Sequence, residues 1–313
     1  MTAHIIRRLF YMLIILFVMS IIMFTFVSLK GDPVAIMLGQ SADQQTIAKI
    51  REQLGLDRPI VVQYLDWLSH IVRGDFGQSY TIPMSTLDVI FQRLPITIEL
   101  TIFSMFFSLL VALPLGIVAA LNYKSKLDIF LLEFSIVNLS MPNFWLGILL
   151  IFLFALKLKI LPASGYVPFT SSPVAHLKLM ILPVLTLSLW YIAVFMAFIR
   201  STFIEVLQSE YILVAYSKGL REKRILWLHA FKNTLIPLVT VVGVNVSSLV
   251  GGAVVTETIF SLPGIGRLFV DSLFGRDMPL IMGIVLLTTV AVVVVNLMVD
   301  IVYTWIDPKI RYE

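Results

Sequence analysis

The four histidines are the residues whose chemistry would be easiest to recognise in this chain. They are His4, His70, His176 and His229. A histidine can act as a general base, assist a serine nucleophile or hold a metal ion. None of the four lies within a long apolar stretch or in an HExxH pattern, and the chain has no cysteine. These features argue against an intramembrane Ser–His hydrolase, a zinc protease and any thiolate or iron–sulfur site.

Nucleotide-binding motifs are also missing. A Walker A loop needs the sequence GxxxxGK[ST], and the dipeptide Gly-Lys occurs nowhere in the chain. Asp75-Phe76-Gly77 spells the metal-binding triplet of kinases, but no catalytic loop accompanies it. Gly264-Ile265-Gly266 lacks the third glycine of the dinucleotide fingerprint. We therefore expect no catalytic residue, no cofactor and no metal on this chain.

The composition is that of a membrane protein. Of the 313 residues, 59% are apolar and 13% are charged, and the mean hydropathy is +0.96. Soluble domains are nearer 45–50% apolar and about 25% charged. Six stretches without charged residues are long enough to cross the ~30 Å hydrocarbon core as helices. They are Leu9–Leu29, Leu100–Leu121, Phe134–Leu156, Leu179–Ile199, Thr234–Thr256 and Met278–Val299. Pro114, Pro142 and Pro183 lie inside these spans and are predicted to kink them.

The short loops carry their positive charges unevenly, which predicts the orientation. Twelve Lys and Arg residues fall on the side of the N-terminus: Arg7, Arg8, Lys124, Lys126, Arg200, Lys218, Arg221, Lys223, Arg224, Lys232, Lys309 and Arg311. Five fall on the other side: Lys157, Lys159, Lys178, Arg267 and Arg276. Positive residues favour the cytoplasmic side, so we expect both termini in the cytoplasm. The net charge of only +4 does not suggest a nucleic-acid partner.

We divide the chain into three parts on this basis. Residues 1–29 are a cytoplasmic N-terminus and the first span, residues 30–96 an external helical segment, and residues 97–313 a five-helix core. In the external segment we expect one helix around Ile47–Leu54, a second beginning after Pro59 and ending near Gly74, and a capping box at Ser85–Asp88. These short helices either cover the mouth of the bundle or form a landing surface for an external partner.

The second cytoplasmic loop, residues 200–233, is long for a connection in a compact bundle. An apolar stripe at helical spacing leads up to Gly219, and a second short helix is predicted from Arg221 to about Phe231. Glycine allows two helices to meet in a tight turn because it adopts positive φ without steric cost. From the residues alone, this elbow is either a docking element or a basic hairpin on anionic lipid.

A few polar residues lie within the predicted spans, where unpaired polar groups are costly. The candidates for lining a translocation path are Asn138, Asn143, Asn245, Ser248 and Asn296. The alternative is that they hold helices together.

Several motifs taken together resemble a known family. Glu210-Tyr211-Ile212-Leu213-Val214-Ala215-Tyr216-Ser217-Lys218-Gly219-Leu220, followed by His229-Ala230-Phe231-Lys232-Asn233 and Ile236-Pro237, resembles the cytoplasmic signature loop of ABC importer permeases. Further matches are Gly31-Asp32-Pro33, Leu54–Pro59, Gly74–Ser79, Glu257–Phe260, Leu262–Gly266 and Asp307–Tyr312. The narrower resemblance is to the first of the two permeases in dipeptide, oligopeptide, glutathione and nickel importers. Leu213 and Val214 replace Glu and Ala of the general pattern.

The resemblance implies an all-α membrane protein with the six-helix type I ABC importer permease fold. It also implies a second homologous permease, two ATPase subunits that hold ATP and Mg²⁺, and an external solute-binding protein that delivers peptides. The elbow would dock on one ATPase through Glu210, Tyr211, Ala215, Lys218, Gly219 and Leu220. The location would be the cytoplasmic (inner) membrane of a bacterium or archaeon.

Other functions stay open at this point. A nickel-chelate or glutathione importer would have the same fold. An intramembrane enzyme would need a nucleophile–base pair in the spans, and a secondary transporter would need an intramembrane acid or base; the spans show neither.

Overall fold

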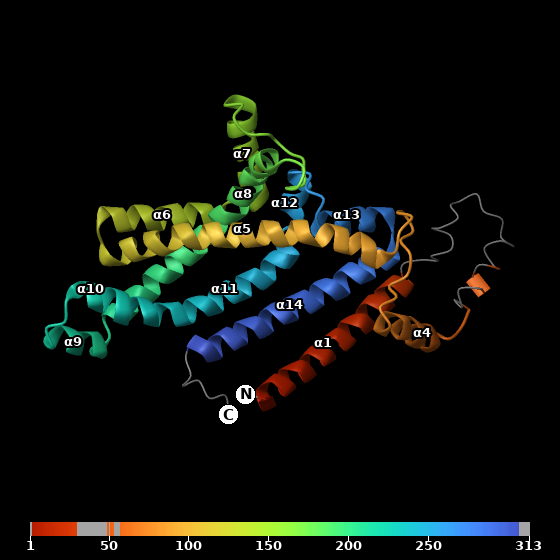
Figure 1. Ribbon diagram of the computed structural model, residues 1–313, viewed down its shortest axis with the longest axis horizontal. Helices are drawn as coiled ribbons and strands as arrows, with labels where there is room; N and C mark the ends of the chain where they lie inside the picture. The colour runs from red at the N-terminus through yellow and green to blue at the C-terminus, as the bar shows by residue number, and fades with distance from the viewer. Residues whose placement is uncertain (1, 30–48, 50, 53–56, 307–313) are drawn as a thin grey trace. The chain divides into compact units, whose positions relative to one another are not determined.

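The protein is helical throughout the part that the computed structural model describes, which comprises residues 2–29, 49, 51–52 and 57–306 (Figure 1). The elements are α1 (Thr2–Leu29), α4 (Ile60–Val72), α5 (Thr86–Leu121), α6 (Lys126–Ser140), α7 (Asn143–Leu150), η1 (Ile151–Lys157), α8 (Pro173–Leu207), α9 (Glu210–Ser217), α10 (Glu222–Arg224), η2 (Ile225–Phe231), α11 (Lys232–Gly252), α12 (Val254–Ile259), α13 (Ile265–Gly275) and α14 (Met278–Ile306). η1 and η2 are π-helical. One isolated antiparallel bridge joins Gln78 and Ser85. The all-α prediction is confirmed.

Five described helical runs are long and apolar enough to cross a membrane. They are Phe10–Val27 of α1, α5, α8, the run Glu222–Val246, and Met278–Val299 of α14. The predicted third span is not one straight helix, because Lys126–Ser140 and Asn143–Lys157 meet at a bend of 102°. Counting this bent pair as one span gives six.

Proline chemistry explains the bend. Pro142 is the N-cap residue of α7, and both it and Met141 have extended backbone angles. A proline has no N–H to donate and its ring clashes with the preceding helical turn. Pro183 and Pro114, predicted to kink their spans in the same way, lie within the continuous helices α8 and α5.

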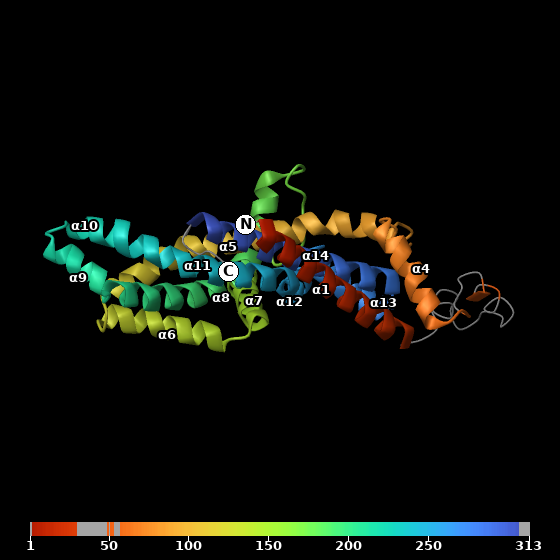
Figure 2. The same cartoon turned by 90° about the horizontal axis from the view of Figure 1, so that it is seen from below.

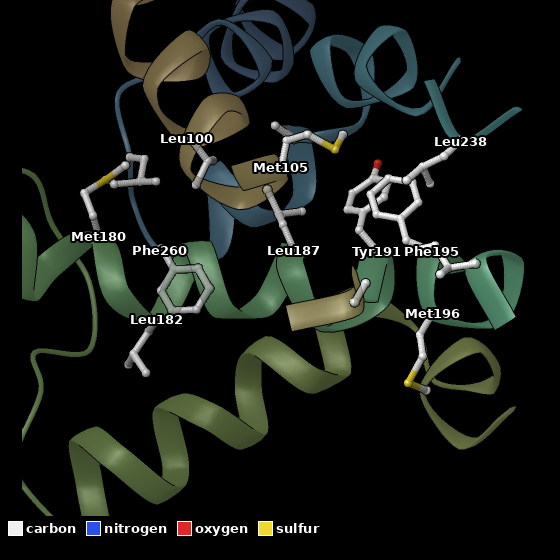
Figure 3. Close-up of a cluster of buried hydrophobic side chains, with 14 of the residues drawn as sticks. Leu100, Met105, Met180, Leu182, Leu187, Tyr191, Phe195, Met196, Leu238 and Phe260 are labelled. Carbon is white, nitrogen blue, oxygen red and sulfur yellow. The ribbon is translucent and has the colours of Figure 1, made fainter. Parts of the chain in front are cut away.

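The chain divides into two compact units: Met1–Pro95 with Arg267–Val293, and Ile96–Gly266 with Val294–Glu313. In the second unit α8 is central and packs against α6, α7 and α11. Its core includes Leu187 and Phe195 of α8, with Leu100 of α5 and Phe260, all labelled in Figure 3. A side chain at Gly116 would lie 2.8 Å from Ile199, so this glycine lets α5 and α8 approach closely.

The first unit includes the described part of the segment that was predicted to be external. α4 begins directly after Pro59, and Gly74 with φ +84° follows its end, as predicted. The expected helix around Ile47–Leu54 lies mostly outside the described residues. The Ser85 cap is confirmed, since the Asp88 N–H donates to Ser85 Oγ at 3.2 Å. The return contact is made by the Ser85 hydroxyl, which donates to Asp88 Oδ2 at 2.6 Å, whereas a full capping box uses the Ser85 N–H. The capped helix, α5, runs through the predicted boundary at residue 96.

Asp277 connects the loop before α5 to the start of α14 within this unit. Its fully buried carboxylate accepts hydrogen bonds through Oδ2 from Ser79 Oγ at 2.5 Å, Thr81 N–H at 2.9 Å and Thr81 Oγ1 at 2.8 Å. Its Oδ1 accepts a 3.3 Å hydrogen bond from the Leu280 N–H in the first turn of α14. One carboxylate therefore caps a helix and fixes a loop about 200 residues away in the sequence.

Candidate functional site

The predicted elbow is present between α8 and α11. α8 ends at Leu207, α9 runs from Glu210 to Ser217, and the chain turns at Gly219 into α10 (Figures 1 and 2). The second helix was predicted to end at about Phe231, and this prediction is wrong. α10 continues through η2 into α11 because no glycine or proline interrupts residues 222–233. The elbow is thus built directly onto the predicted fifth span.

The turn at Gly219 is a Schellman motif. The Leu220 N–H donates to the Ala215 carbonyl at 3.3 Å, and the Gly219 N–H donates to the Tyr216 carbonyl at 2.9 Å. Gly219 has φ +71°, the left-handed conformation that this motif requires. A Cβ atom there would meet nothing within 4 Å, so backbone strain alone favours glycine.

A small apolar cluster holds the two arms of the elbow together. Ile212 and Ala215 of α9 pack against Ile225 of η2, and Leu220 covers them. Ala215 is only 6% exposed. Its side chain therefore packs inside the elbow, whereas the family resemblance had placed Ala215 among the residues that dock on the ATPase.

The outer side of α9 carries exposed apolar residues. Leu213 is 60% exposed, and Val214 and Tyr216 are also exposed. Glu210 and Lys218, at the two ends of α9, are exposed as well. Tyr211 accepts a 2.9 Å hydrogen bond at its hydroxyl oxygen from Asn233 Nδ2, which connects α9 to α11. An exposed surface with apolar and charged residues on a well-fixed helix is suited to binding another protein.

The elbow is anchored to the bundle by a second cluster. Ala230 of η2 is fully buried against Phe203 of α8 and Ala120 of α5. Since α9 follows α8 after only Gln208 and Ser209, and η2 continues into α11, a movement of the elbow would be transmitted to both long helices.

An ion pair that the sequence did not reveal lies near the same end of α8. Arg200 donates from Nε and Nη2 to the two carboxylate oxygens of Asp128, at 2.5 and 2.7 Å. Asp128 also accepts the Lys124 N–H at 2.9 Å, and its own N–H donates to Ser125 Oγ. The partners are 72 residues apart, so no local pattern announces the pair.

A buried acid explains one of the motifs quoted above. Glu257 is fully buried and accepts a 2.6 Å hydrogen bond from the Thr97 hydroxyl, which in turn accepts the Ile265 N–H at 2.9 Å. A Cβ atom at Gly264 would overlap the Glu257 carboxylate. Gly264 is therefore required by its packing against the acid. A Cβ atom at Gly266 would lie 2.6 Å from Val254 Cα, so the second glycine also serves packing.

Three of the five polar residues predicted as path candidates donate hydrogen bonds within their own helices. Asn138 and Asn245 donate to carbonyls of their own helices, at Phe134 and Val241, and Ser248 donates to Val244. Asn138 is buried, whereas Ser248 and Asn296 are exposed.

Asn143 differs from the others. Its Oδ1 is buried and accepts no hydrogen bond in the described part of the protein. This atom lies directly after Pro142, at the bend between α6 and α7. Among the path candidates, Asn143 thus has a buried oxygen that is available to accept a hydrogen bond.

Sequence comparison now identifies the family. Residues 112–312 match the family described as binding-protein-dependent transport system inner membrane component. Residues 1–101 match the N-terminal family of the same membrane components. The chain belongs to this permease family.

Relatives match this permease over its full length. The oligopeptide transport system permease protein AppB of Bacillus subtilis is 37% identical, and all of both chains is covered. The glutathione transport system permease protein GsiC of Escherichia coli is also 37% identical, again with full coverage of both chains. The permease is accordingly a multi-pass inner-membrane transport component of an ABC importer.

The fold agrees with this assignment. An inward-facing structure of the MetNI methionine ABC transporter matches with a TM-score of 0.58 at 14% identity, covering 71% of the permease and 97% of the other chain. At this identity the likeness concerns the fold. The predicted ABC importer permease fold is confirmed.

Proposed function

We propose that this permease forms half of the translocation pathway of an ATP-driven importer for di- or oligopeptides. A second homologous permease forms the other half, and an external solute-binding protein delivers the peptide. ATP and Mg²⁺ bind to two separate ATPase subunits, and both termini of the permease lie in the cytoplasm. The chain itself carries no cofactor.

The geometry of the elbow is the observation that supports its role in coupling ATP hydrolysis to transport. Its backbone is fixed by the Schellman motif at Gly219, its two arms are held together by the cluster around Ala215, and it exposes Leu213 and Tyr216. A loop that only lies on lipid does not need such a fixed turn. We infer that α9 docks in a groove of one ATPase subunit and transmits its movement to α8 and α11.

The cargo assignment rests on the relatives and is the finer part of the proposal. Their names include oligopeptide and glutathione systems at equal identity. Glutathione is itself a small peptide, so an importer of glutathione is the main alternative, followed by an importer of nickel chelates with the same fold. The specificity of the cognate binding protein is expected to determine which of these cargoes is transported.

Reconstitution tests the proposal. The permease, its second permease and the ATPase subunits are placed in proteoliposomes with the cognate binding protein. ATP hydrolysis is measured with dipeptides, longer peptides, glutathione and a nickel chelate. We expect peptide-loaded binding protein to stimulate hydrolysis and uptake. Stoichiometric ATP binding by the permease alone, or stimulation by the nickel chelate but by no peptide, would contradict the proposal.

Cross-linking tests the elbow separately. The chain has no cysteine, so Leu213→Cys introduces a unique thiol on the exposed side of α9. It is expected to cross-link to an ATPase subunit with a short bifunctional reagent. Phe274→Cys is the control, since Phe274 is 85% exposed but lies on the predicted external side. Equal cross-linking of both cysteines would refute the docking assignment.

A further inference from the structure

α4 has three chemically different faces, each marked by helical spacing. Tyr64 and Trp67 face α1, where Tyr64 pairs with the rings of Phe17 and Phe24 and Trp67 with Phe24. The Tyr64 hydroxyl lies 2.8 Å from Ser20 Oγ, which is buried on α1. α4 is therefore held along the C-terminal half of a helix that is apolar enough to cross a membrane.

The second face of α4 is polar. Gln63, Asp66 and His70, at positions i, i+3 and i+7, line a hollow of about 300 Å³. Arg58, Asp75 and Tyr80 line it as well. Pro279 and Met282 in the first turns of α14, together with Phe24 near the end of the α1 span, complete part of its wall. The hollow thus lies beside the C-terminal end of the α1 span and the beginning of the α14 span.

The third face is apolar and exposed. Val61, Leu65 and Val72, at positions i, i+4 and i+11, are 63%, 57% and 80% exposed. At about 100° per residue they form one stripe, which lies roughly opposite the polar face and beside the face that contacts α1. Water would be an unfavourable neighbour for such a stripe.

We propose that α4 is an interfacial helix whose stripe of Val61, Leu65 and Val72 lies among the acyl chains of the leaflet in which the α1 span ends. The polar face then points toward the headgroups and water, as expected for a helix lying in the plane of the interface. α1, against which α4 packs, also exposes apolar side chains in its C-terminal half, where Val18, Ile21 and Ile22 are 46%, 40% and 53% exposed. Tyr64 and Trp67 are the side-chain types enriched at this depth.

The occupant of the stripe is therefore lipid, and α4 is neither a cover over the bundle nor a landing surface for a soluble partner. The choice of lipid follows from continuity with a span and from the polar face on the opposite side. A soluble binding protein would be expected to contact the polar face instead. The inference needs only that α1 spans the membrane, so it does not depend on the cargo or on the orientation of the permease.

Spin labelling measures the depth directly. Single cysteines replace Leu65 on the stripe and Asp66 on the polar face, with Phe106→Cys as a lipid-facing reference on α5, where Phe106 is 64% exposed. The assembled importer is reconstituted in phospholipid nanodiscs, and collisions of each nitroxide with oxygen and with a water-soluble nickel complex are compared. Hydrolysis by each labelled complex confirms that it is folded.

The expected result is that the Leu65 label collides several-fold more often with oxygen than with the nickel complex, as the Phe106 label does, and that the Asp66 label shows the reverse. A Leu65 label as accessible to nickel as the Asp66 label would overturn the proposal in favour of a water-facing surface. A Leu65 label shielded from both reagents would also overturn it, in favour of a covering protein subunit. Val72→Cys repeats the measurement should the Leu65 variant not assemble.

Discussion

His176 Nε2 lies 2.6 Å from Glu99 Oε1, and its Nδ1 lies 2.8 Å from the Val167 carbonyl oxygen. A carbonyl oxygen only accepts, so Nδ1 carries a proton and donates it. Nε2 and the Glu99 carboxyl then share one further proton. His176 is 1% exposed between the rings of Tyr166 and Phe169, so this contact fastens the 161–172 loop to α5.

Truncating the histidine is expected to destabilise the permease more than neutralising the acid. His176→Ala leaves the Val167 carbonyl and Glu99 without their partner, at a cost of roughly 2–4 kcal/mol. Glu99→Gln can still donate a hydrogen bond to Nε2 and is expected to cost less than half as much. Thermal unfolding of the purified permease in detergent measures both. Equal losses would contradict this, because the hydrogen bond that Glu99→Gln retains would then not replace the contact with the carboxyl group.

Substitutions at Gly219 are expected to follow backbone preference rather than side-chain size. The space around it is open and its φ is +71°, so Asn is expected to be tolerated, Ala to cost ~1 kcal/mol and Val up to ~3 kcal/mol. These costs are small for the whole bundle but comparable with the preference of the elbow for one geometry. Gly219→Val is expected to insert and assemble, yet to lose coupling between ATP hydrolysis and transport.

Lys223→Ala is the matched control for this series, because Lys223 is exposed on the same elbow. Transport and hydrolysis are measured in parallel, with subunit pull-down to verify assembly. Normal transport by Gly219→Val together with a defect in Lys223→Ala would favour the basic lipid-binding hairpin instead.

Ala215 is expected to tolerate neither a charge nor a cavity. Ala215→Asp buries a carboxylate against Ile212 and Ile225, at a cost of roughly 2–4 kcal/mol. Ala215→Gly costs about 1 kcal/mol through helix propensity. The amount of ATPase recovered by pull-down is expected to fall slightly for Ala215→Gly and strongly for Ala215→Asp. The spans are expected to stay inserted in both variants. Full retention of the ATPase by Ala215→Asp would show that the cluster does not hold the elbow in shape.

Tyr80 is expected to ionise at a pH well above that of an ordinary tyrosine. Burial, and secondarily the nearby Asp277 carboxylate, raise the pKa of Tyr80 from 10.0 to about 12. Between these pH values the unfolded chain has lost the phenolic proton and the folded chain retains it, so the free energy of unfolding falls as pH rises from 10 to 12. Below pH 10 the group has no effect. Difference absorbance of tyrosinate between wild type and Tyr80→Phe measures the transition; one centred near pH 10 would contradict the burial argument.

Topology is tested with the same cysteine-free chain. A membrane-impermeant thiol reagent applied to intact cells is expected to label Phe274→Cys and to spare Lys223→Cys. Both side chains are exposed, so accessibility to the reagent reports the side of the membrane. The opposite pattern would reverse the proposed orientation.

Much of the elbow could be predicted from the sequence. The stripe ending at Ala215 and the glycine at 219 are local signals, and a Schellman turn is built from local hydrogen bonds. The same holds for the cap at Ser85 and the helix after Pro59. These features depend on contacts between residues that are close in the sequence, so the sequence alone is enough to predict them.

The sequence also determined by itself that the chain spans a membrane and that Pro142 disturbs the third span, because hydropathy and proline geometry act over a single helix. Tertiary structure decided the rest. The size of the bend, 102°, depends on what α6 and α7 pack against. The pairs Arg200–Asp128, His176–Glu99 and Thr97–Glu257 join residues 72, 77 and 160 positions apart. Their energies come from burial and directed hydrogen bonds, and only the packed helices bring those atoms within reach of one another.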